Sequence, residues 1–289
     1  MRVYLDNAAT TQIAPEVIDY MSDLMRNDYA NPSSIHHGGR KSRIIIENAR
    51  KTVSGFLNTS PGNIFFTSGG TEADNMAIRC GILDNNITHA ITSSISHKAV
   101  IYPLEELKEK NHISLDYIKL DSNGRVDLNH LDTLLKNNDR TFVSIMHANN
   151  EIGTIQPIVE IGEICKKYNA VFHCDTVQTM AHYPIDLQKL NVDFITGSAH
   201  KFHGPKGVGF IYISDNINIK PFISGGSQER NMRAGTENVH SIAGLAKAME
   251  LSYSNMEKDK IYISEIKKYM IDQLSKNIKD IKFNANCTD

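Results

Sequence analysis

The sequence is poor in several features that mark particular classes of protein. Its 289 residues contain no tryptophan and only four cysteines, which are widely spaced and form no CxxC pair: Cys80, Cys165, Cys174 and Cys287. Such cysteines indicate neither a disulfide framework nor a cysteine-ligated zinc site, and they are typical of a reducing compartment. No stretch approaches the roughly 20 consecutive apolar residues that a membrane span needs. These absences predict a cytoplasmic protein that is neither exported nor embedded in a membrane.

An excess of charge of one sign is also lacking. The 31 lysines and arginines nearly balance 33 aspartates and glutamates, for a net charge of −2. Without a basic field there is little to attract nucleic acid or an anionic membrane. The 12 histidines include no HExxH motif and no cluster with carboxylates, so we expect no metal site. The partner should therefore be a small molecule held in a pocket.

Short apolar runs alternate with longer amphipathic segments, which is the pattern of an α/β fold. Runs rich in Ile, Val and Phe predict six buried strands, at residues 64–67, 89–92, 141–146, 170–174, 193–196 and 208–213. Helical spacing of apolar residues appears between them, for example over residues 157–168. We expect one largely parallel sheet covered by helices.

From residue 257 onward the pattern is that of one long amphipathic helix. Its apolar stripe comprises Ile263, Ile266, Met270, Leu274 and Ile278, and a strand-like Ile-Lys-Phe follows at residues 281–283. One helix and one strand cannot enclose a core of their own. We therefore expect this tail to dock on something else, as the beginning of a second domain that the chain does not finish.

A glycine-rich turn follows the first predicted strand. Gly69 and Gly70 precede a helix start at which Thr71 is a candidate N-cap, with Asp74 three residues later as in a capping box. Glycines let backbone amides approach an anion, and the helix N-terminus adds positive potential. The turn is either a phosphate site or an ordinary strand-to-helix connection. No Walker loop and no GxGxxG motif occurs in the sequence.

Polar groups stand at the ends of three further predicted strands. Asp175 follows an apolar run, and strand alternation places it on the same face as His173 and opposite Cys174. Because ligands bind at the carboxyl ends of strands in open α/β sheets, Asp175 is a candidate partner for a protonated heteroaromatic nitrogen. An aspartate at this place is also common as a cap or turn residue. Cys174 fits a buried small hydrophobe better than a nucleophile.

Lys201 and His97 are the other two candidates at strand ends. Lys201 lies among small and aromatic residues, where desolvation can leave a neutral amine that forms a Schiff base. Lys206, in a Gly-Pro-Lys-Gly turn, fits an exposed surface charge. His97 could stack on a planar cofactor or move protons, but from the residues alone we interpret it as an N-terminal helix residue.

Seven blocks of sequence together resemble the cysteine desulfurases, which are pyridoxal-phosphate enzymes of aminotransferase class V and fold type I. The blocks are residues 4–11, 31–36, 67–75, 146–154, 173–178, 198–207 and 233–238. They occur in the order found in the family and cover the chain from residue 4 to about 240. Jointly they are much more specific than any one of them.

The resemblance implies a domain organisation and a set of cofactor contacts. Residues 14–255 would form the large pyridoxal-phosphate domain, with its mostly parallel sheet flanked by helices. Residues 1–13 and 256–289 would form an incomplete small α+β domain. Lys201 would carry the cofactor as a Schiff base, Asp175 would pair with the pyridine nitrogen, and His97 would stack on the ring. The other contacts implied are Gln178 and Asn150 near the ring hydroxyl, Gly70, Thr71, Ser198 and His200 at the phosphate, and Thr236 at the phosphate of a neighbouring subunit.

The resemblance also implies a reaction and partners. L-cysteine would be converted to L-alanine, with Lys201 and His97 as catalytic residues and the sulfur left as a persulfide on an enzyme cysteine. The protein would act as a homodimer and pass sulfur to an acceptor or scaffold protein, for iron-sulfur cluster or thio-nucleoside synthesis. No nucleic acid, membrane or metal is implied.

The sequence departs from the family in its C-terminal part. The small-residue loop that carries the catalytic cysteine is not found, nor is the arginine that binds the substrate carboxylate, and Cys287 lacks the loop context. The chain is therefore expected to bind cofactor but to transfer sulfur poorly. Two alternatives stay open: another class V enzyme, such as an aminotransferase or selenocysteine lyase, or a non-catalytic scaffold.

Overall fold

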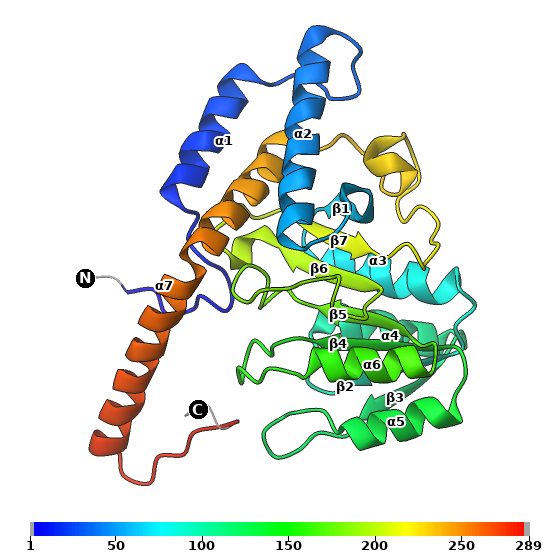
Figure 1. Cartoon of the computed structure of the whole chain (residues 1–289), viewed down its shortest axis with the longest axis vertical. Coiled ribbons are helices and arrows are strands. Elements are labelled where there is room, and N and C mark those ends of the chain that lie inside the picture. Colours follow the sequence, from blue (N-terminus) through cyan, green and yellow to red (C-terminus); the bar gives the residue numbers. More distant parts are fainter. Residues whose placement is uncertain (1–2, 286–289) are drawn as a thin grey trace.

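The computed structural model describes residues 3–285 and contains one sheet of seven strands in the order β1-β7-β6-β5-β4-β2-β3 (Figure 1). Strand β7 is antiparallel to both of its neighbours, while the pairs among the other strands are parallel. The strands are β1 (Ile64–Thr67), β2 (His89–Ser93), β3 (Ser114–Ile118), β4 (Thr141–Met146), β5 (Val171–Asp175), β6 (Phe194–Ser198) and β7 (Gly209–Ile213).

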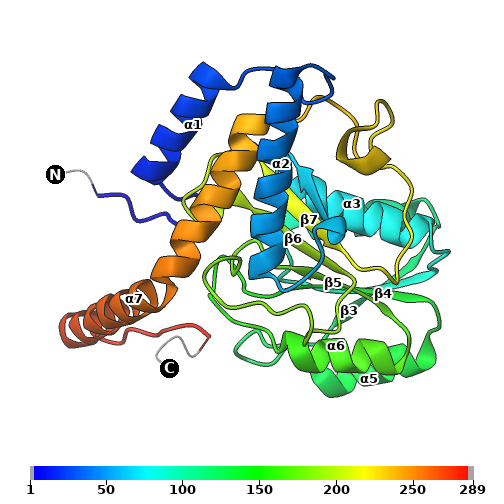
Figure 2. The ribbon, with the colours of Figure 1, turned by 45° about the horizontal axis from the view of Figure 1, so that its top comes forward.

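Helices cover both faces of this sheet, as the two views show (Figures 1 and 2). Apolar side chains of α3 and α4 pack on one face, and those of α1, α2, α5, α6 and α7 pack on the other. The α-helices are α1 (Pro15–Asn27), α2 (His37–Phe56), α3 (Gly70–Leu83), α4 (Lys98–Glu109), α5 (Leu128–Asn137), α6 (Ile158–Lys167) and α7 (Val239–Asn277). Short 3₁₀ turns are η1 (Pro61–Asn63), η2 (Ala199–Lys201) and η3 (Gln228–Asn231). The predicted α/β architecture is confirmed.

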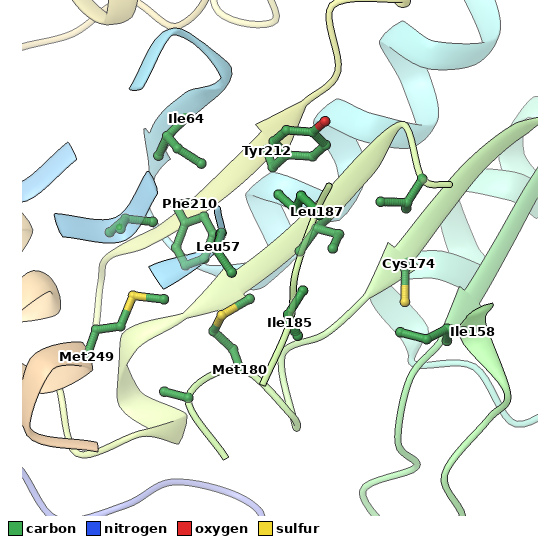
Figure 3. Close-up of a cluster of buried hydrophobic side chains, with 14 of the residues drawn as sticks. Leu57, Ile64, Ile158, Cys174, Met180, Ile185, Leu187, Phe210, Tyr212 and Met249 are labelled. Atoms are coloured by element: carbon green, nitrogen blue, oxygen red, sulfur yellow. The ribbon is translucent and has the colours of Figure 1, made fainter. Parts of the chain in front are cut away.

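The core on the α2, α6 and α7 side is built from aliphatic, aromatic and sulfur-containing side chains (Figure 3). Leu57, Phe210 and Met249 are fully buried there, and they come from the end of α2, from β7 and from α7. Cys174 also lies in this cluster, near Ile158. The alternation along β5 is therefore as predicted, with Cys174 on the face opposite His173 and Asp175.

All six predicted strands form, and the sheet contains a seventh strand that was not predicted. The missed strand, β3, lies at the edge of the sheet, and only Leu115 and Ile118 of its five residues are buried. Its sequence, Ser-Leu-Asp-Tyr-Ile, lacks the continuous apolar run of the central strands. The prediction of a strand at residues 281–283 was wrong, because that segment has no strand partner and no extended hydrogen-bonded structure.

Helix α7 begins at Val239, well before the start predicted at residue 257. Its first turns are buried on several sides, with the last buried residue at Met249, so this part shows no amphipathic stripe. The outer turns project from the body of the molecule (Figure 1), and Ile263, Ile266 and Met270 are about half exposed or more. Within residues 3–285, no helix is both long and apolar enough to cross a membrane.

Candidate active site

The carboxyl ends of β1, β2, β4, β5 and β6 lie at one edge of the sheet, because these strands run in the same direction. The segments that follow them meet around a cavity of about 410 Å³. Nine of the ten predicted site residues line this cavity: Gly70, Thr71, His97, Asn150, Asp175, Gln178, Ser198, His200 and Lys201. The topology of the sheet thus brings together side chains that are more than 100 positions apart in the sequence.

The N-terminus of α3 forms one wall of the cavity. A Cβ atom on Gly70 would lie 2.7 Å from Val177 Cγ2, so only glycine lets the chain pass this close to the segment after β5. The first amides of an α-helix have no acceptor within the helix and carry positive potential. Gly70, Thr71 and the buried Ser198 therefore form a wall that can bind an anion.

The predicted capping box at this helix was wrong. The N-cap is Gly69, which has no side chain, and Thr71 is already inside the helix. Instead, Glu72 Oε2 accepts a hydrogen bond from Ser68 N at 2.8 Å, and the Glu72 carboxylate pairs with Arg233 at 2.8 Å. Asp74 is buried and accepts from Thr196 Oγ1, so it is not a cap residue.

Lys201 lies at the end of η2 with its amine in the cavity. Lys201 Nζ donates to the carbonyl oxygen of Ala9 at 3.0 Å and also to that of Ala8. Burial lowers the pKa of Lys201, although the charges of Asp175 and Asp6 act in the opposite direction. A larger share of neutral amine than in a free lysine is the consequence, and neutral amines are nucleophiles.

Asp175 ends β5 and is 5% exposed, with its carboxylate on the cavity wall. Its Oδ1 accepts a hydrogen bond from Val177 N at 2.9 Å. Burial raises the pKa of Asp175 to about 7, with a further contribution from the nearby Asp74 carboxylate. A cationic N–H group in the cavity would stabilise its charged form.

His97 is the N-cap of α4, as the alternative reading of the sequence expected. Its Nδ1 accepts a hydrogen bond from Ala99 N at 3.1 Å. This bond requires a lone pair on Nδ1, so the neutral ring carries its proton on Nε2. The imidazole is thus fixed at the cavity in one tautomer, with an N–H group available.

The N-terminal segment also contributes to the cavity, which the sequence alone did not predict. Asp6, Ala8 and Ala9 line it, and Gln178 Nε2 donates to Ala8 O at 3.1 Å. Thr11 N donates to His200 O at 2.9 Å and ties this segment to the lysine loop. Residues 4–11 were among the matching blocks, but they follow none of the predicted strands, so the sequence pattern did not single out Asp6.

Thr236 is the one predicted site residue that lies elsewhere. It is exposed and lines a separate hollow of about 230 Å³ together with Ser68, Glu229 and Arg233. Arg233 joins this loop to the start of α3 through its pair with Glu72. In this chain Thr236 therefore does not reach the cavity that contains Lys201.

Three cysteines lie within the described residues, and all are buried: Cys80, Cys165 and Cys174. Burial raises the pKa of Cys80 to about 12 and also raises the pKa of Cys165 and of Cys174. None of these three lines the cavity that contains Lys201, and they are poor candidates for a nucleophilic thiolate. Cys287 falls outside the described residues. No group of three or more His, Cys, Asp or Glu side chains in residues 3–285 is placed to hold a metal ion.

Comparisons with known proteins agree with the geometry. The family model described as aminotransferase class-V matches residues 3–288. A protein named cysteine desulfurase IscS, from Dictyoglomus turgidum, is 46% identical over 286 residues, which are 98% of this chain and 72% of that protein. A solved structure titled NifS-like protein superposes with a TM-score of 0.91 at 40% identity, covering 95% of this chain and 76% of the other. A second solved structure, titled SspA in complex with cysteine, superposes with a TM-score of 0.82 at 34% identity. The match covers 86% of this chain and 72% of the other.

Proposed function

This chain belongs to the class-V aminotransferase family, among relatives named cysteine desulfurases, and on that premise we propose that it is a pyridoxal-phosphate-dependent cysteine desulfurase. The reaction converts L-cysteine to L-alanine and leaves the sulfur on an enzyme cysteine as a persulfide. The observation that carries the proposal is that Lys201, Asp175 and the N-terminus of α3 line one cavity.

The residue types around the cavity fit pyridoxal phosphate. The helix N-terminus, with its close approach at Gly70, suits the phosphate, the buried Asp175 carboxylate suits the protonated pyridine nitrogen, and the Lys201 amine suits covalent attachment. When bound, the cofactor supplies an electron sink that stabilises negative charge developing at the substrate Cα. The sixteen cavity residues include no second lysine, so we assign the attachment to Lys201.

The remaining cavity residues would bind and orient the cofactor. We assign Thr71, Ser198 and His200 to its phosphate, together with the amide of Gly70, and Asn150 and Gln178 to the hydroxyl side of the ring. His97 would cover one face of the ring. Its Nδ1 is already used by Ala99 N, so the ring orientation is set by a backbone hydrogen bond rather than by substrate.

Two side chains would move protons. Lys201 Nζ, once released as a neutral amine, would accept the α-proton of L-cysteine, and the lowered pKa of Lys201 favours this form. His97 would exchange a proton with the substrate through Nε2, because Nδ1 is engaged. Both groups lie at the cavity surface, where an amino acid can reach them.

We propose a homodimer in which Thr236 serves the cofactor phosphate of the partner. Its position supports this, because Thr236 is exposed and lies outside the cavity of its own chain. The ion pair between Glu72 and Arg233 would then couple the anion-binding end of one site to the loop that serves the other. The three free cysteines support the cytoplasmic location that the sequence predicts.

The persulfide step requires a reactive cysteine. Because the three described cysteines are buried with raised pKa values, we propose that none of these three receives the sulfur. Delivery of sulfur to an acceptor protein, for iron-sulfur clusters or thio-nucleosides, also stays a proposal.

For the domains, we propose that residues 14–255 form the cofactor-binding unit, while residues 1–13 and 256–289 belong to a second, partial unit. Support comes from α7, whose last buried residue is Met249 and whose outer turns are exposed. The boundary then falls inside a continuous helix rather than in a linker.

The test uses α-hydrogen exchange, which needs the cofactor and the base but no cysteine nucleophile. The protein is loaded with pyridoxal phosphate in deuterium oxide, and exchange at Cα of L-cysteine and L-alanine is followed by proton NMR. We expect exchange that Lys201→Ala reduces by about 10² or more. Lys206→Ala, an exposed lysine in the same loop, is the matched control and should be unaffected.

Absence of exchange in the loaded wild-type protein would contradict the proposed function. Release of keto acid or selenide from other amino acids, in place of exchange with L-cysteine, would favour a different class V enzyme. No change in cofactor absorbance between wild type and Lys201→Ala would favour a non-catalytic scaffold. Mass spectrometry of the protein after L-cysteine treatment separately checks whether Cys80, Cys165 or Cys174 carries persulfide.

A further inference from the structure

At the wall of the cavity lies a buried cluster of two carboxyl groups and one imidazole, of which the proposed roles use only Asp175. Asp74 is 2% exposed, His173 is 0% exposed and Asp175 is 5% exposed. His173 Nε2 lies 3.5 Å from Asp74 Oδ1, and the same oxygen accepts a hydrogen bond from Thr196 Oγ1 at 2.8 Å. Titratable groups of α3 and β5 thus meet where almost no water reaches them.

His173 has one satisfied and one unsatisfied nitrogen. Its Nδ1 lies 2.9 Å from Ser144 Oγ, whereas Nε2 is fully buried and has no hydrogen-bond partner. An unpaired buried polar atom is costly, and native structures contain few of them. Asp74 Oδ1 is the carboxylate oxygen beside Nε2. A proton between these two atoms would satisfy both of them.

Electrostatics disfavours charge on both carboxyl groups. Two carboxylates in a low-dielectric interior repel one another, and each is disfavoured by desolvation. Burial raises the pKa of Asp74 to about 7 and lowers the pKa of His173 to about 4. Both carboxyl groups line the cavity, but it is Asp175 whose charge interacts with the Lys201 ammonium. The charge therefore belongs on Asp175.

We propose that Asp74 and His173 share one proton beyond the single N–H proton of a neutral imidazole, so that the pair has no net charge and Asp175 carries the net charge of the cluster. The proton resides on Asp74, as a neutral carboxyl beside a neutral imidazole, or on His173 Nε2, as an imidazolium beside a carboxylate. The pair is uncharged in either form. Asp74 is thus a positioning residue: it acts on the cofactor through the charge of Asp175, and this inference rests on the proposed function.

The groups that face Asp74 come from several elements. Strand β5 contributes His173 and Asp175, and β6 contributes the uncharged Thr196. His97 at the start of α4 and Lys201 on η2 lie across the cavity. The Lys201 amine therefore interacts with Asp175, and Asp74 receives the hydroxyl of Thr196.

Isoelectric focusing of the cofactor-free protein tests this proposal directly, because the pI expected from the sequence is about 6.6. An ordinary aspartate is ionised at that pH, so replacing it by asparagine removes a full negative charge and raises the pI. We expect Asp74→Asn to raise the native pI by less than about half as much as Asp19→Asn, an exposed control on α1. In urea the two variants should shift equally.

Equal native shifts for Asp74→Asn and Asp19→Asn would overturn the proposal. If Asp74→Asn does not fold, NMR of the wild-type chain with labelled aspartate carboxyl carbons and histidine nitrogens decides instead. At pH 6 the proposal expects a protonated Asp74 carboxyl or a His173 imidazolium. An ionised Asp74 beside a neutral His173 would refute it.

These measurements are independent of the proposed function, because they need no cofactor. A chain that fails to bind pyridoxal phosphate would contradict the function while the focusing result still stands. A spectroscopic readout links the two: in the loaded protein, a pH-dependent change in cofactor absorbance that reports loss of the shared proton should disappear in Asp74→Asn. If the absorbance change persists in Asp74→Asn, the proton shared by Asp74 and His173 is not its source.

Discussion

At the scale of single residues, Lys201 is placed between two opposing influences. Burial disfavours its ammonium form, while the carbonyl oxygens of Ala8 and Ala9 and the charge of Asp6 favour it. Burial has the larger effect, and the pKa of Lys201 is lowered. The N-terminal segment therefore adjusts the availability of the amine as well as covering the cavity.

The rate of covalent cofactor attachment should reflect this balance. Attachment needs the neutral amine, so the rate should rise with pH to a midpoint below the ordinary lysine value of 10.5. Asp6→Asn removes a charge that favours the ammonium form and should move the midpoint further down. Stopped-flow absorbance over a pH series measures it, with Asp19→Asn as the control. An upward shift in Asp6→Asn would contradict this account.

At the scale of elements, the edge strand β1 is completed by side chains instead of another strand. Arg50 Nη1 donates to Ile64 O at 2.7 Å, and Phe66 N donates to Glu229 Oε2 at 2.8 Å. The buried Arg50 and Glu229 also pair with each other at 2.7 Å. This pair satisfies an edge that would otherwise expose free backbone groups, and it fixes the loop that leads to Arg233 and Thr236.

Breaking this pair should be costly, because it leaves a buried charge without its partner. Arg50→Met and Glu229→Gln should each lower the free energy of unfolding by about 3–5 kcal/mol. Lys110→Met, which breaks the exposed pair with Glu106, should change it by less than about 1 kcal/mol. Urea unfolding measures all three. Similar small losses for the buried and the exposed pair would contradict this interpretation.

The outer turns of α7 lead to a second prediction at this scale. Ile263, Ile266 and Met270 are 60%, 48% and 54% exposed, so they contribute little to the packed core. Replacing all three by lysine should change the free energy of unfolding by less than about 1 kcal/mol and should reduce self-association. Urea unfolding and analytical ultracentrifugation test the two parts. Loss of the fold would show that the outer turns are packed in solution.

At the scale of the whole molecule, buried histidines make stability depend on pH. Burial lowers the pKa of His147 to about 4, so between pH 6.5 and 4 the unfolded chain binds a proton that the folded chain does not. The free energy of unfolding is unaffected by this difference above pH 6.5, and it decreases as the pH falls from 6.5 to 4. His147→Asn removes this pH dependence.

On acidification the free energy of unfolding of the wild type should therefore fall more than that of His147→Asn. The difference between the two should change by at most about 3 kcal/mol between pH 6.5 and 4. Urea unfolding at several pH values measures it, and taking the difference cancels the titration of all other groups. A difference that does not vary with pH would mean that His147 is not buried as a neutral ring.

The sequence predicted the central strands because each is a continuous apolar run, buried on both faces. Strand ends and the glycine turn indicated five of the cavity residues, because parallel strands deliver their carboxyl ends to one edge of the sheet: Gly70, Thr71, His97, Asp175 and Lys201. The family resemblance supplied four more: Asn150, Gln178, Ser198 and His200. Edge strand β3 was not predicted, because most of its residues face solvent and it lacks a continuous apolar run. Asp74 was taken for a cap because its partners, Thr196 and His173, come from strands about 100 or more positions later. Local pattern cannot show such pairings.

Helix α7 is anchored to the body of the molecule by its inner turns. These turns pack against α1 and α2. Ser252 Oγ donates to the carbonyl oxygen of Phe202, the residue after Lys201, at 3.2 Å. Beyond Ser252 about 25 residues of the helix remain, which is roughly 38 Å at 1.5 Å per residue. The Ser252 hydrogen bond thus connects the base of this long helical extension directly to the residue that follows Lys201.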